Sequence, residues 1–177
     1  RVADASQPAE PLRASDAAEF PAGWTVDGQL LFSDNGDRLS LWNATDGTVT
    51  TLSEGEGNAV NPELSPDGRW MAYSGWAGDR FQIFVRPFPG PGPRTQVSIQ
   101  GGYSPKWSED GREISYVSYN DAENPDSYMM RVDIQTGAEL EIGQPEQGFG
   151  WRYGMSRPVS RFDRAPDGRY LIGIHEQ

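Results

Sequence analysis

The sequence has no cysteine, a single histidine at His175, and only one lysine, Lys106, among its 15 basic residues. Without cysteine it can form neither disulfides nor thiolate-ligated zinc or iron–sulfur sites. No apolar run approaches the roughly 20 residues that span a bilayer, and residues 170–174 are among the longest. A disulfide framework, a thiol enzyme and a membrane-spanning helix are therefore not expected.

The residues of common catalytic machineries are also missing. A serine hydrolase needs a nucleophile, a histidine base and an orienting acid, but His175 lies two residues from the end and no Gly-x-Ser-x-Gly motif is present. Lys106 does not follow a glycine-rich phosphate loop. We therefore expect no enzyme activity, no catalytic residue and no cofactor in this chain. Any catalysis would belong to a domain outside it.

The net charge limits the expected binding partners, and the glycine, proline and aromatic content limits the expected fold. With 26 acidic against 15 basic residues the net charge is −11, and such a surface repels phosphate backbones and anionic lipid. Nucleic-acid binding and membrane insertion are therefore not expected. The 177 residues include 21 glycines and 14 prolines, yet 11% are aromatic. This combination predicts a packed core of short strands joined by tight turns, not a helical bundle.

An Asp-Gly pair recurs along the chain at intervals of 40, 43 and 57 residues. Glycine tolerates a positive φ angle and aspartate nearly does, so each pair predicts a two-residue hairpin turn. The position four residues after each aspartate is apolar, and we expect it to be buried. The four pairs are Asp27-Gly28, Asp67-Gly68, Asp110-Gly111 and Asp167-Gly168, and the apolar residues are Leu31, Met71, Ile114 and Leu171.

Four strands per repeat, repeated at this interval, predict an all-β fold, a β-propeller of four-stranded antiparallel blades. We expect three whole blades and two partial ones, as part of a six-bladed ring; a small four-bladed ring is the alternative. The expected blades are about 22–58, 61–100, 104–145 and 161–177, with 1–13 as the tail of a preceding blade. The strand after each turn is expected at 29–33, 70–75, 113–119 and 169–174. The third strand is expected at 38–43, 81–87 and 127–134, and the fourth at 48–52, 95–99 and 139–143.

Specific stretches carry a family resemblance. Residues 65–73, Ser-Pro-Asp-Gly-Arg-Trp-Met-Ala-Tyr, resemble the WD-like repeat of TolB-type β-propellers. Residues 84–90, 101–108 and 162–169 resemble the C-terminal half of propellers fused to bacterial serine/threonine kinases. The resemblance implies six blades, a noncatalytic interaction or sensing role, and an extracytoplasmic or periplasmic location.

Two groups of aromatic residues have different expected roles. Those on predicted strands belong to the core: Trp24, Trp70, Tyr73, Trp107 and Tyr116. Others lie in predicted loops beside glycines and arginines, as on protein-binding surfaces. The strand order places the loops 33–38, 75–80 and 120–127 on the same face as 53–61, 100–104 and 144–158. We hypothesise that a protein or small ligand binds there, with these contact residues: Trp76, Arg80, Tyr103, Trp151 and Arg152.

Two acidic stretches, 34–37 and 121–126, fall between predicted strands, and we interpret them as polar turns, so no metal site is assigned. The predicted function is a non-catalytic binding or sensing module of a larger signalling protein, linked to a kinase. Two alternatives stay open. One is a propeller that gates a prolyl oligopeptidase-type serine peptidase, and the other is a free periplasmic TolB-like partner protein.

Overall fold

The computed structural model describes residues 15–172 apart from 35–36, 54, 56, 119–126, 138 and 152–161. The predicted tail at 1–13 lies outside the described residues. The part of the chain that is described contains strands and connections but no helix, so none that is long and apolar enough to cross a membrane. The all-β prediction is confirmed.

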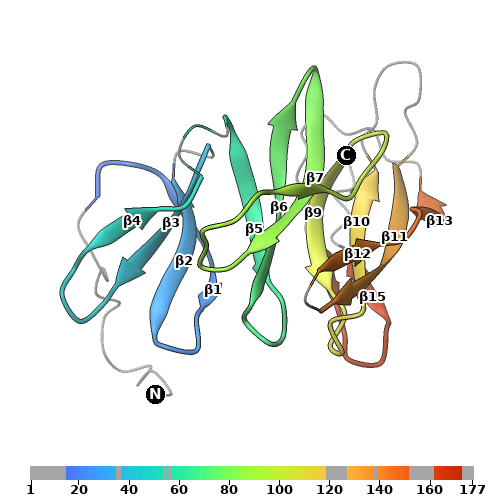
Figure 1. The fold of residues 1–177 in the computed structure, drawn as a ribbon. Helices are drawn as coiled ribbons and strands as arrows, with labels where there is room; N and C mark the ends of the chain where they lie inside the picture. Colours follow the sequence, from blue (N-terminus) through green and yellow to red (C-terminus); the bar gives the residue numbers. More distant parts are fainter. Residues whose placement is uncertain are drawn as a thin grey trace, which may run out of the picture.

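The strands form four antiparallel sheets, in which consecutive strands pair in chain order except that β13 pairs with β11 (Figure 1). Sheet 1 contains β1 (Glu19–Trp24), β2 (Gln29–Asp34), β3 (Arg38–Asn43) and β4 (Val49–Thr51). Sheet 2 contains β5 (Ala59–Leu64), β6 (Trp70–Ala77), β7 (Arg80–Pro87) and β8 (Thr95–Gln96). Sheet 3 contains β9 (Gly102–Trp107), β10 (Glu113–Ser118), β11 (Ser127–Thr136), β12 (Leu140–Ile142) and β13 (Glu146–Trp151). Sheet 4 contains β14 (Phe162–Arg164) and β15 (Tyr170–Ile172).

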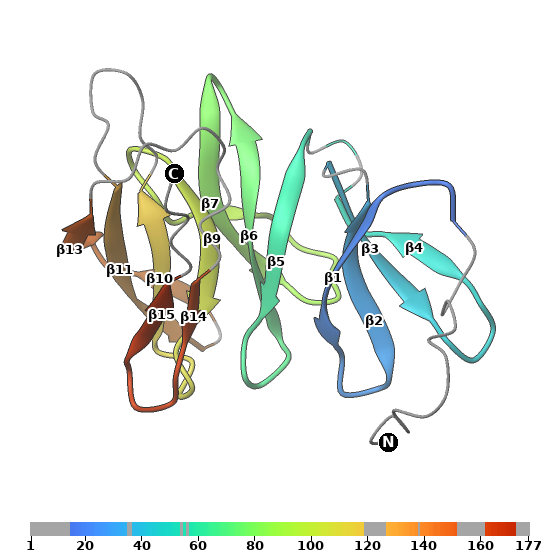
Figure 2. The same ribbon diagram turned by 180° about the vertical axis from the view of Figure 1, so that it is seen from behind.

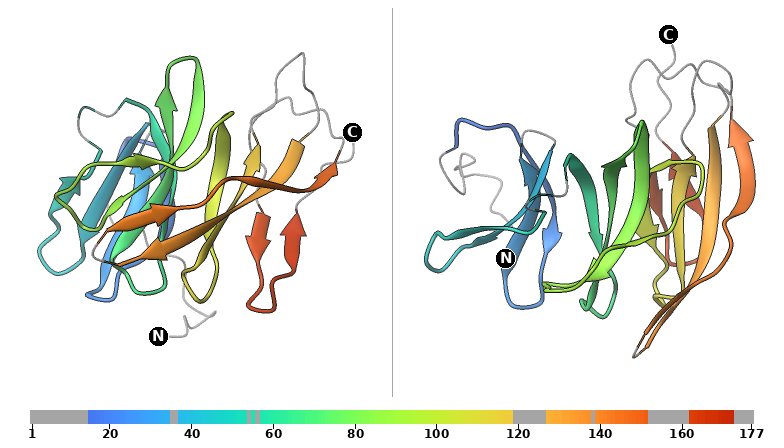
Figure 3. Two further views of the ribbon diagram at one scale, coloured as in Figure 1. Left: turned by 45° about the vertical axis from the view of Figure 1, so that its right-hand side comes forward. Right: turned by 45° about the horizontal axis from the view of Figure 1, so that its top comes forward.

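The sheets stack face to face, with β14–β15 at one end and sheet 1 at the other (Figure 3). The first strand of each sheet lies beside the first strand of the next (Figure 2). Three clusters of buried side chains join neighbouring sheets. Sheets 1 and 2 share Leu31, Leu39, Leu41, Ala59, Met71, Tyr73 and Phe84. Sheets 2 and 3 share Ala72, Ile83, Val85, Val97, Trp107, Ile114, Tyr116, Val132 and Ile134. Sheets 3 and 4 share Val117, Met129 and Phe162.

Each repeated Asp-Gly pair forms the turn between the first two strands of a sheet. The glycines have positive φ angles, between 68° and 83°, but the aspartates do not. In sheet 2 the Gly68 amide donates to the Ser65 carbonyl and closes a four-residue turn, whose last residue, Gly68, has the left-handed conformation. The predicted two-residue turn is therefore wrong in type: only the glycine needs φ > 0, as in a type I turn followed by a bulge. A further pair, Asp46-Gly47, makes the β3–β4 turn outside the repeat.

A hydroxyl two residues before the aspartate holds three of these turns. Ser65 Oγ donates to Asp67 Oδ1 at 2.6 Å and accepts the Trp70 amide at 3.0 Å. Thr25 and Ser108 bond their aspartates in the same way. The hydrogen bond from Ser65 is the main cause that lowers the pKa of Asp67 to about 2. The fourth turn has Ala165 at this position and lacks the hydroxyl.

The hairpins differ in length by one residue. In sheets 2 and 3 the closing bonds join Ser65 to Trp70 and Ser108 to Glu113, whereas Thr25 bonds Gln29 in sheet 1 and Ala165 bonds Arg169 in sheet 4. A shift of one residue turns a side chain to the other face of a sheet.

This shift decides which neighbour the post-turn residue contacts. Met71 and Ile114 face the preceding sheet, and Leu31 faces the following one; all three are buried, as predicted. Leu171 has the short hairpin of sheet 1 and no following sheet among the described residues. It is 75% exposed, so its predicted burial is wrong.

The predicted core aromatics are confirmed with one exception. Tyr73, Trp107 and Tyr116 are buried, and Trp70 packs against the cluster between sheets 2 and 3. Trp24 is 55% exposed, so its predicted place in the core is wrong. It lies on the face of sheet 1 opposite sheet 2, where no described strand precedes it.

The connection predicted after the fourth strand of sheet 3 contains an additional strand. β12 and β13 both pair with β11, from Thr136 to Ile134 and then from Arg131 to Ser127, along the same edge. The outer edge of sheet 3 is therefore longer than predicted, and residues 146–151, expected in a loop, are part of the ladder. Trp151 ends this strand, paired with Ser127.

Candidate functional site

The two ends of the stack differ in their connections. The Asp-Gly hairpins lie at one end, and the β6–β7 hairpin projects from the other (Figures 1 and 2). Backbone bonds bring two connections to the projecting end: the Trp76 amide donates to the Asn58 carbonyl at 2.8 Å, and the Ala59 amide donates to the Asp37 carbonyl at 3.0 Å. We call this end the loop face. For the described connections it agrees with the predicted arrangement.

The β6–β7 hairpin projects from the loop face (Figure 1). Its two strands have eight residues each, and the ladder continues to Ala77 and Arg80. Only Gly78 and Asp79 form the loop, with Gly78 at φ 70°, as a two-residue hairpin requires. Trp76 therefore lies in a strand, not in a loop as predicted. Tyr103 also lies in a strand, β9.

Three aromatic rings form a cluster near the tip of this hairpin, one residue pair from its loop. Trp76 pairs with Phe81 across the ladder, and their ring centroids are 5.0 Å apart, edge to face. The Phe81 ring lies 4.9 Å from that of Tyr103 on sheet 3. Trp76 is 42% exposed, whereas Tyr103 is buried. The cluster thus presents one tryptophan to solvent and holds it on rings from two sheets.

Arg80 begins β7 beside this cluster and pairs with the loop residue before it. Its Nε and Nη2 donate to the two carboxylate oxygens of Asp79, each at 2.9 Å. The hydrogen bond from Arg80 is the main cause that lowers the pKa of Asp79. The hairpin tip therefore carries a positive and a negative group side by side next to an exposed tryptophan.

Buried polar contacts fix the connection between β8 and β9, and Tyr103 lies near the start of β9. Ser98 Oγ donates to Gln82 Oε1 at 2.5 Å and accepts the Ile83 amide at 2.8 Å. The Gly101 amide donates to the same Gln82 oxygen at 2.9 Å. A Cβ at Gly102 would lie 2.6 Å from the Tyr116 ring, so only glycine fits there. These contacts hold Tyr103 under Phe81.

The structure brings together two of the five predicted contact residues. Trp76 and Tyr103 both pack against Phe81, which the sequence reasoning missed. Arg80 precedes Phe81 in β7 and pairs with Asp79. Pairing the two strands across a two-residue loop would have placed Phe81 opposite Trp76. Trp151 belongs to β13 on sheet 3, and Arg152 lies outside the described residues.

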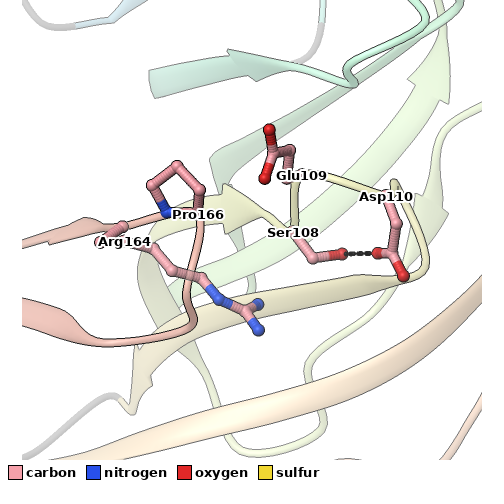
Figure 4. Close-up of a pocket in the computed structure, with 6 residues that line it drawn as sticks. Ser108, Glu109, Asp110, Arg164 and Pro166 are labelled. Carbon is pink, nitrogen blue, oxygen red and sulfur yellow. Dashed lines mark hydrogen bonds between the residues drawn. The ribbon is translucent and has the colours of Figure 1, made fainter.

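At the opposite end, a cavity of about 430 Å³ lies between the turns of sheets 3 and 4 (Figure 4). Arg164 on one wall donates to Glu113 Oε1 at 2.6 Å and to Ser115 Oγ at 3.2 Å. On the other wall Asp110 accepts the Ser108 hydroxyl. These charged groups already have partners in the chain, so we interpret the cavity as a seam between sheets. Its lining is Ser108, Glu109, Asp110, Arg164, Ala165 and Pro166.

The first strands of sheets 2 and 3 carry an ion pair between equivalent repeat positions. Lys106 Nζ lies 2.8 Å from Glu63 Oε2. Burial raises the pKa of Glu63, and Lys106 opposes that shift. Among the described residues, no group of three acidic or histidine side chains is placed to hold a metal; of the two acidic stretches, 35–36 and 121–126 lie outside them.

Comparisons with known proteins support the fold. The chain is 32% identical over 154 residues to an uncharacterised protein of Agrobacterium fabrum, covering 82% of this chain and 51% of that one. It therefore spans about half the length of this curated relative. No family profile matches the chain.

Solved structures share the architecture. The fold resembles that of a protein assigned as TolB from Agrobacterium tumefaciens, with a TM-score of 0.61, 24% identity, and coverage of 88% of this chain and 57% of that one. The comparison with TolB from Acinetobacter baumannii gives a TM-score of 0.57 and 21% identity, and it covers 77% of this chain and 35% of that one. The comparison with the β-propeller domain of the Trilobed protease from Pyrococcus furiosus gives a TM-score of 0.53 and 16% identity, and it covers 91% of this chain and 50% of that one. The stacked sheets therefore form part of a β-propeller, and the fold is TolB-like.

Proposed function

We propose that this chain is a non-catalytic recognition module that binds a protein or small ligand on the loop face. The observation that carries the proposal is Trp76, which is 42% exposed at a projecting hairpin and held by Phe81 and Tyr103. A large aromatic side chain on a rigid support is the type of residue that dominates binding energy at interfaces. Trp151 and Arg152 remain predicted contributors.

A link to a signalling kinase rests on the sequence resemblance alone, as does an extracytoplasmic location. Two alternatives stay open: a free TolB-like partner protein, and a propeller that accompanies a peptidase. The fold shared with the two TolB structures supports the first. The propeller of the Trilobed protease and the puromycin-hydrolysing peptidase of Mycobacterium tuberculosis share the fold, the latter with a TM-score of 0.58. In that reading, too, the catalytic residues would lie outside this chain.

Differential capture tests the proposal. The purified chain is immobilised, and captured proteins are quantified by mass spectrometry for the unaltered chain and for Trp76→Ala. The control is Trp24→Ala, which removes a tryptophan of similar exposure from another surface. We expect a set of proteins to lose at least about tenfold enrichment with Trp76→Ala only, as for an interface hot spot. If no captured protein depends on Trp76 while both variants melt like the parent, the proposal of a protein partner on the loop face is wrong.

A further inference from the structure

The third strand of sheet 2 extends farther toward the loop face than the strand outside it. The Ile83 carbonyl accepts the Val97 amide at 2.8 Å, and the Ile83 amide donates to Ser98 Oγ at 2.8 Å. After Ser98 the chain leaves this edge for β9. Sheet 1 makes the same pair of bonds at Leu39, the second residue of β3. Three residues of β7 precede Ile83, so β7 reaches two residues beyond the equivalent strand.

This extension leaves one backbone position open at the outer edge of sheet 2, at Phe81. Residues two apart in an antiparallel strand direct their amide and carbonyl groups to the same edge. Those of Phe81 therefore point away from β6, as those of Ile83 do. Within the described part of the chain, no hydrogen bond is formed to the Phe81 amide or carbonyl on this edge. An unpaired strand edge is a template for pairing with another chain.

Sheet 3 shows how the same edge is filled. The post-turn residues of the two sheets pair with Arg86 of β7 and Val132 of β11, which are therefore equivalent. Five residues before them lie Phe81 and Ser127. In sheet 3 this position is covered, because β13 pairs antiparallel with that part of β11 and Trp151 is the partner of Ser127 (Figure 1). The molecule thus already places an added strand on the edge that β7 leaves open.

We propose that the loop face binds an extended segment of a partner protein, which adds as a strand to the outer edge of β7 in the place that β13 has on β11. This partner class rests on the proposed function of the loop face. The segment runs antiparallel to β7, donates an amide to the Phe81 carbonyl and accepts the Phe81 amide. Main-chain bonds of this kind give affinity, and the alternating side chains of the segment give specificity.

The aromatic cluster defines the side chain that fits. A residue opposite Phe81 has its side chain on the same face as Phe81. There the ring centroids of Trp76 and Tyr103 lie 5.0 Å and 4.9 Å from that of Phe81, so an apolar residue is favoured. Asp79 and Arg80 pair with each other at the tip, and the chain has a net charge of −11. Basic residues in the rest of the segment are therefore favoured over acidic ones.

Hydrogen exchange, measured by NMR on the full chain, tests the open edge. We expect the Phe81 amide to exchange at least about tenfold faster than the Ile83 amide, which is bonded to Ser98. A protected Phe81 amide in the chain alone would mean that the edge is already covered, and it would overturn the proposal.

A random peptide library displayed on phage supplies ligands for the binding test. Peptides are selected on the immobilised chain, and their dissociation constants are measured by fluorescence anisotropy. We expect binders that slow exchange of the Phe81 amide and lose at least about tenfold in affinity with Trp76→Ala. N-methylation of the peptide amide that bonds Phe81 should abolish binding. The matched control is N-methylation of the adjacent amide, which points away from β7 and should tolerate the change.

Two variants of the chain separate the backbone from the ring. Phe81→Ala and Phe81→Pro both remove the aromatic side chain, but only proline removes the outward amide, as is tolerated at a sheet edge. We expect Phe81→Pro to bind at least about tenfold more weakly than Phe81→Ala. N-methylation leaves the chain unaltered, so it decides the case if Phe81→Pro does not fold.

The outcomes separate strand addition from the proposed function. Binders that depend on Trp76 but tolerate N-methylation at every amide would overturn strand addition and leave the proposed function standing. A library without binders, or binders that leave the Phe81 amide unprotected, would also overturn strand addition. The capture experiment with Trp76→Ala would then still decide the proposed function.

Discussion

Two neighbouring interfaces of the stack, between sheets 2 and 3 and between sheets 3 and 4, are stabilised by different side chains. The first buries Trp107 and Ile114 among apolar side chains of both sheets, with the Lys106–Glu63 ion pair beside them. In the second, Arg164 replaces the tryptophan and bonds Glu113, while the Tyr170 hydroxyl lies 2.9 Å from Ser115 Oγ. Among the described residues, fewer buried apolar side chains accompany this polar network. The repeat therefore conserves the stacking geometry while the chemistry at one position decides how each contact is stabilised.

The largest expected effect concerns the apolar interface. Ile114→Ala removes a fully buried side chain and should lower the free energy of unfolding by about 3 kcal/mol, through lost burial and a residual cavity. Leu171→Ala, at the same repeat position but exposed, should change it by less than about 0.5 kcal/mol when the chain is monomeric. Urea unfolding followed by circular dichroism measures both. Equal losses would mean that Leu171 is covered within the monomer.

Truncating a side chain in the polar interface between sheets 3 and 4 should lower the free energy of unfolding by less. The side chains of Arg164 and Glu113 are 17% and 20% exposed. Glu113→Ala leaves the Arg164 charge without its carboxylate and should cost about 2 kcal/mol, less than for a fully buried pair. Replacing both residues by leucine should recover at least half of that loss, since apolar groups remove the desolvation penalty. A double variant as unstable as Glu113→Ala would show that the polar network is required by geometry.

The smallest expected effect is in the turns, where sheets 2 and 4 differ by one hydroxyl. Ser65→Ala should cost about 1 kcal/mol by removing the bonds to Asp67 and Trp70. It should also raise the pKa of Asp67 from about 2 toward its ordinary value of 3.8.

Because the folded pKa of Asp67 is the lower one, its contribution is complete above about pH 4 and is lost as the pH falls toward about 2. Carboxyl titration by NMR measures the shift. Ala165→Ser, which supplies the hydroxyl missing from sheet 4, should stabilise the chain slightly. An unchanged titration of Asp67 in Ser65→Ala would contradict the assigned cause.

Most of the fold could be predicted from the repeat, because Asp-Gly turns and alternating apolar residues are local signals. The errors arose where burial depends on a neighbour. Trp24 has the sequence environment of a core residue, but no described sheet covers it. Leu171 was expected to behave like Ile114, and the hairpin that is shorter by one residue turns it to the other face.

The candidate site was predictable in part. Trp76 stands out beside glycines, but its support by Phe81 follows from strand register and its packing on Tyr103 from the contact of two sheets. Neither signal is local in sequence. The extension of sheet 3 by β13 was missed for a similar reason, since residues 146–151 pair with a strand that begins 19 residues earlier, at Ser127.

The one-residue difference between hairpins has a consequence for how such chains diverge. A single insertion or deletion in one turn would exchange the neighbours of every side chain along the strand that follows it. All four turns keep the Asp-Gly pair although their length varies, and sheets with short and long hairpins stack on one another. The apolar residues of each second strand must therefore match the length of the turn that precedes them.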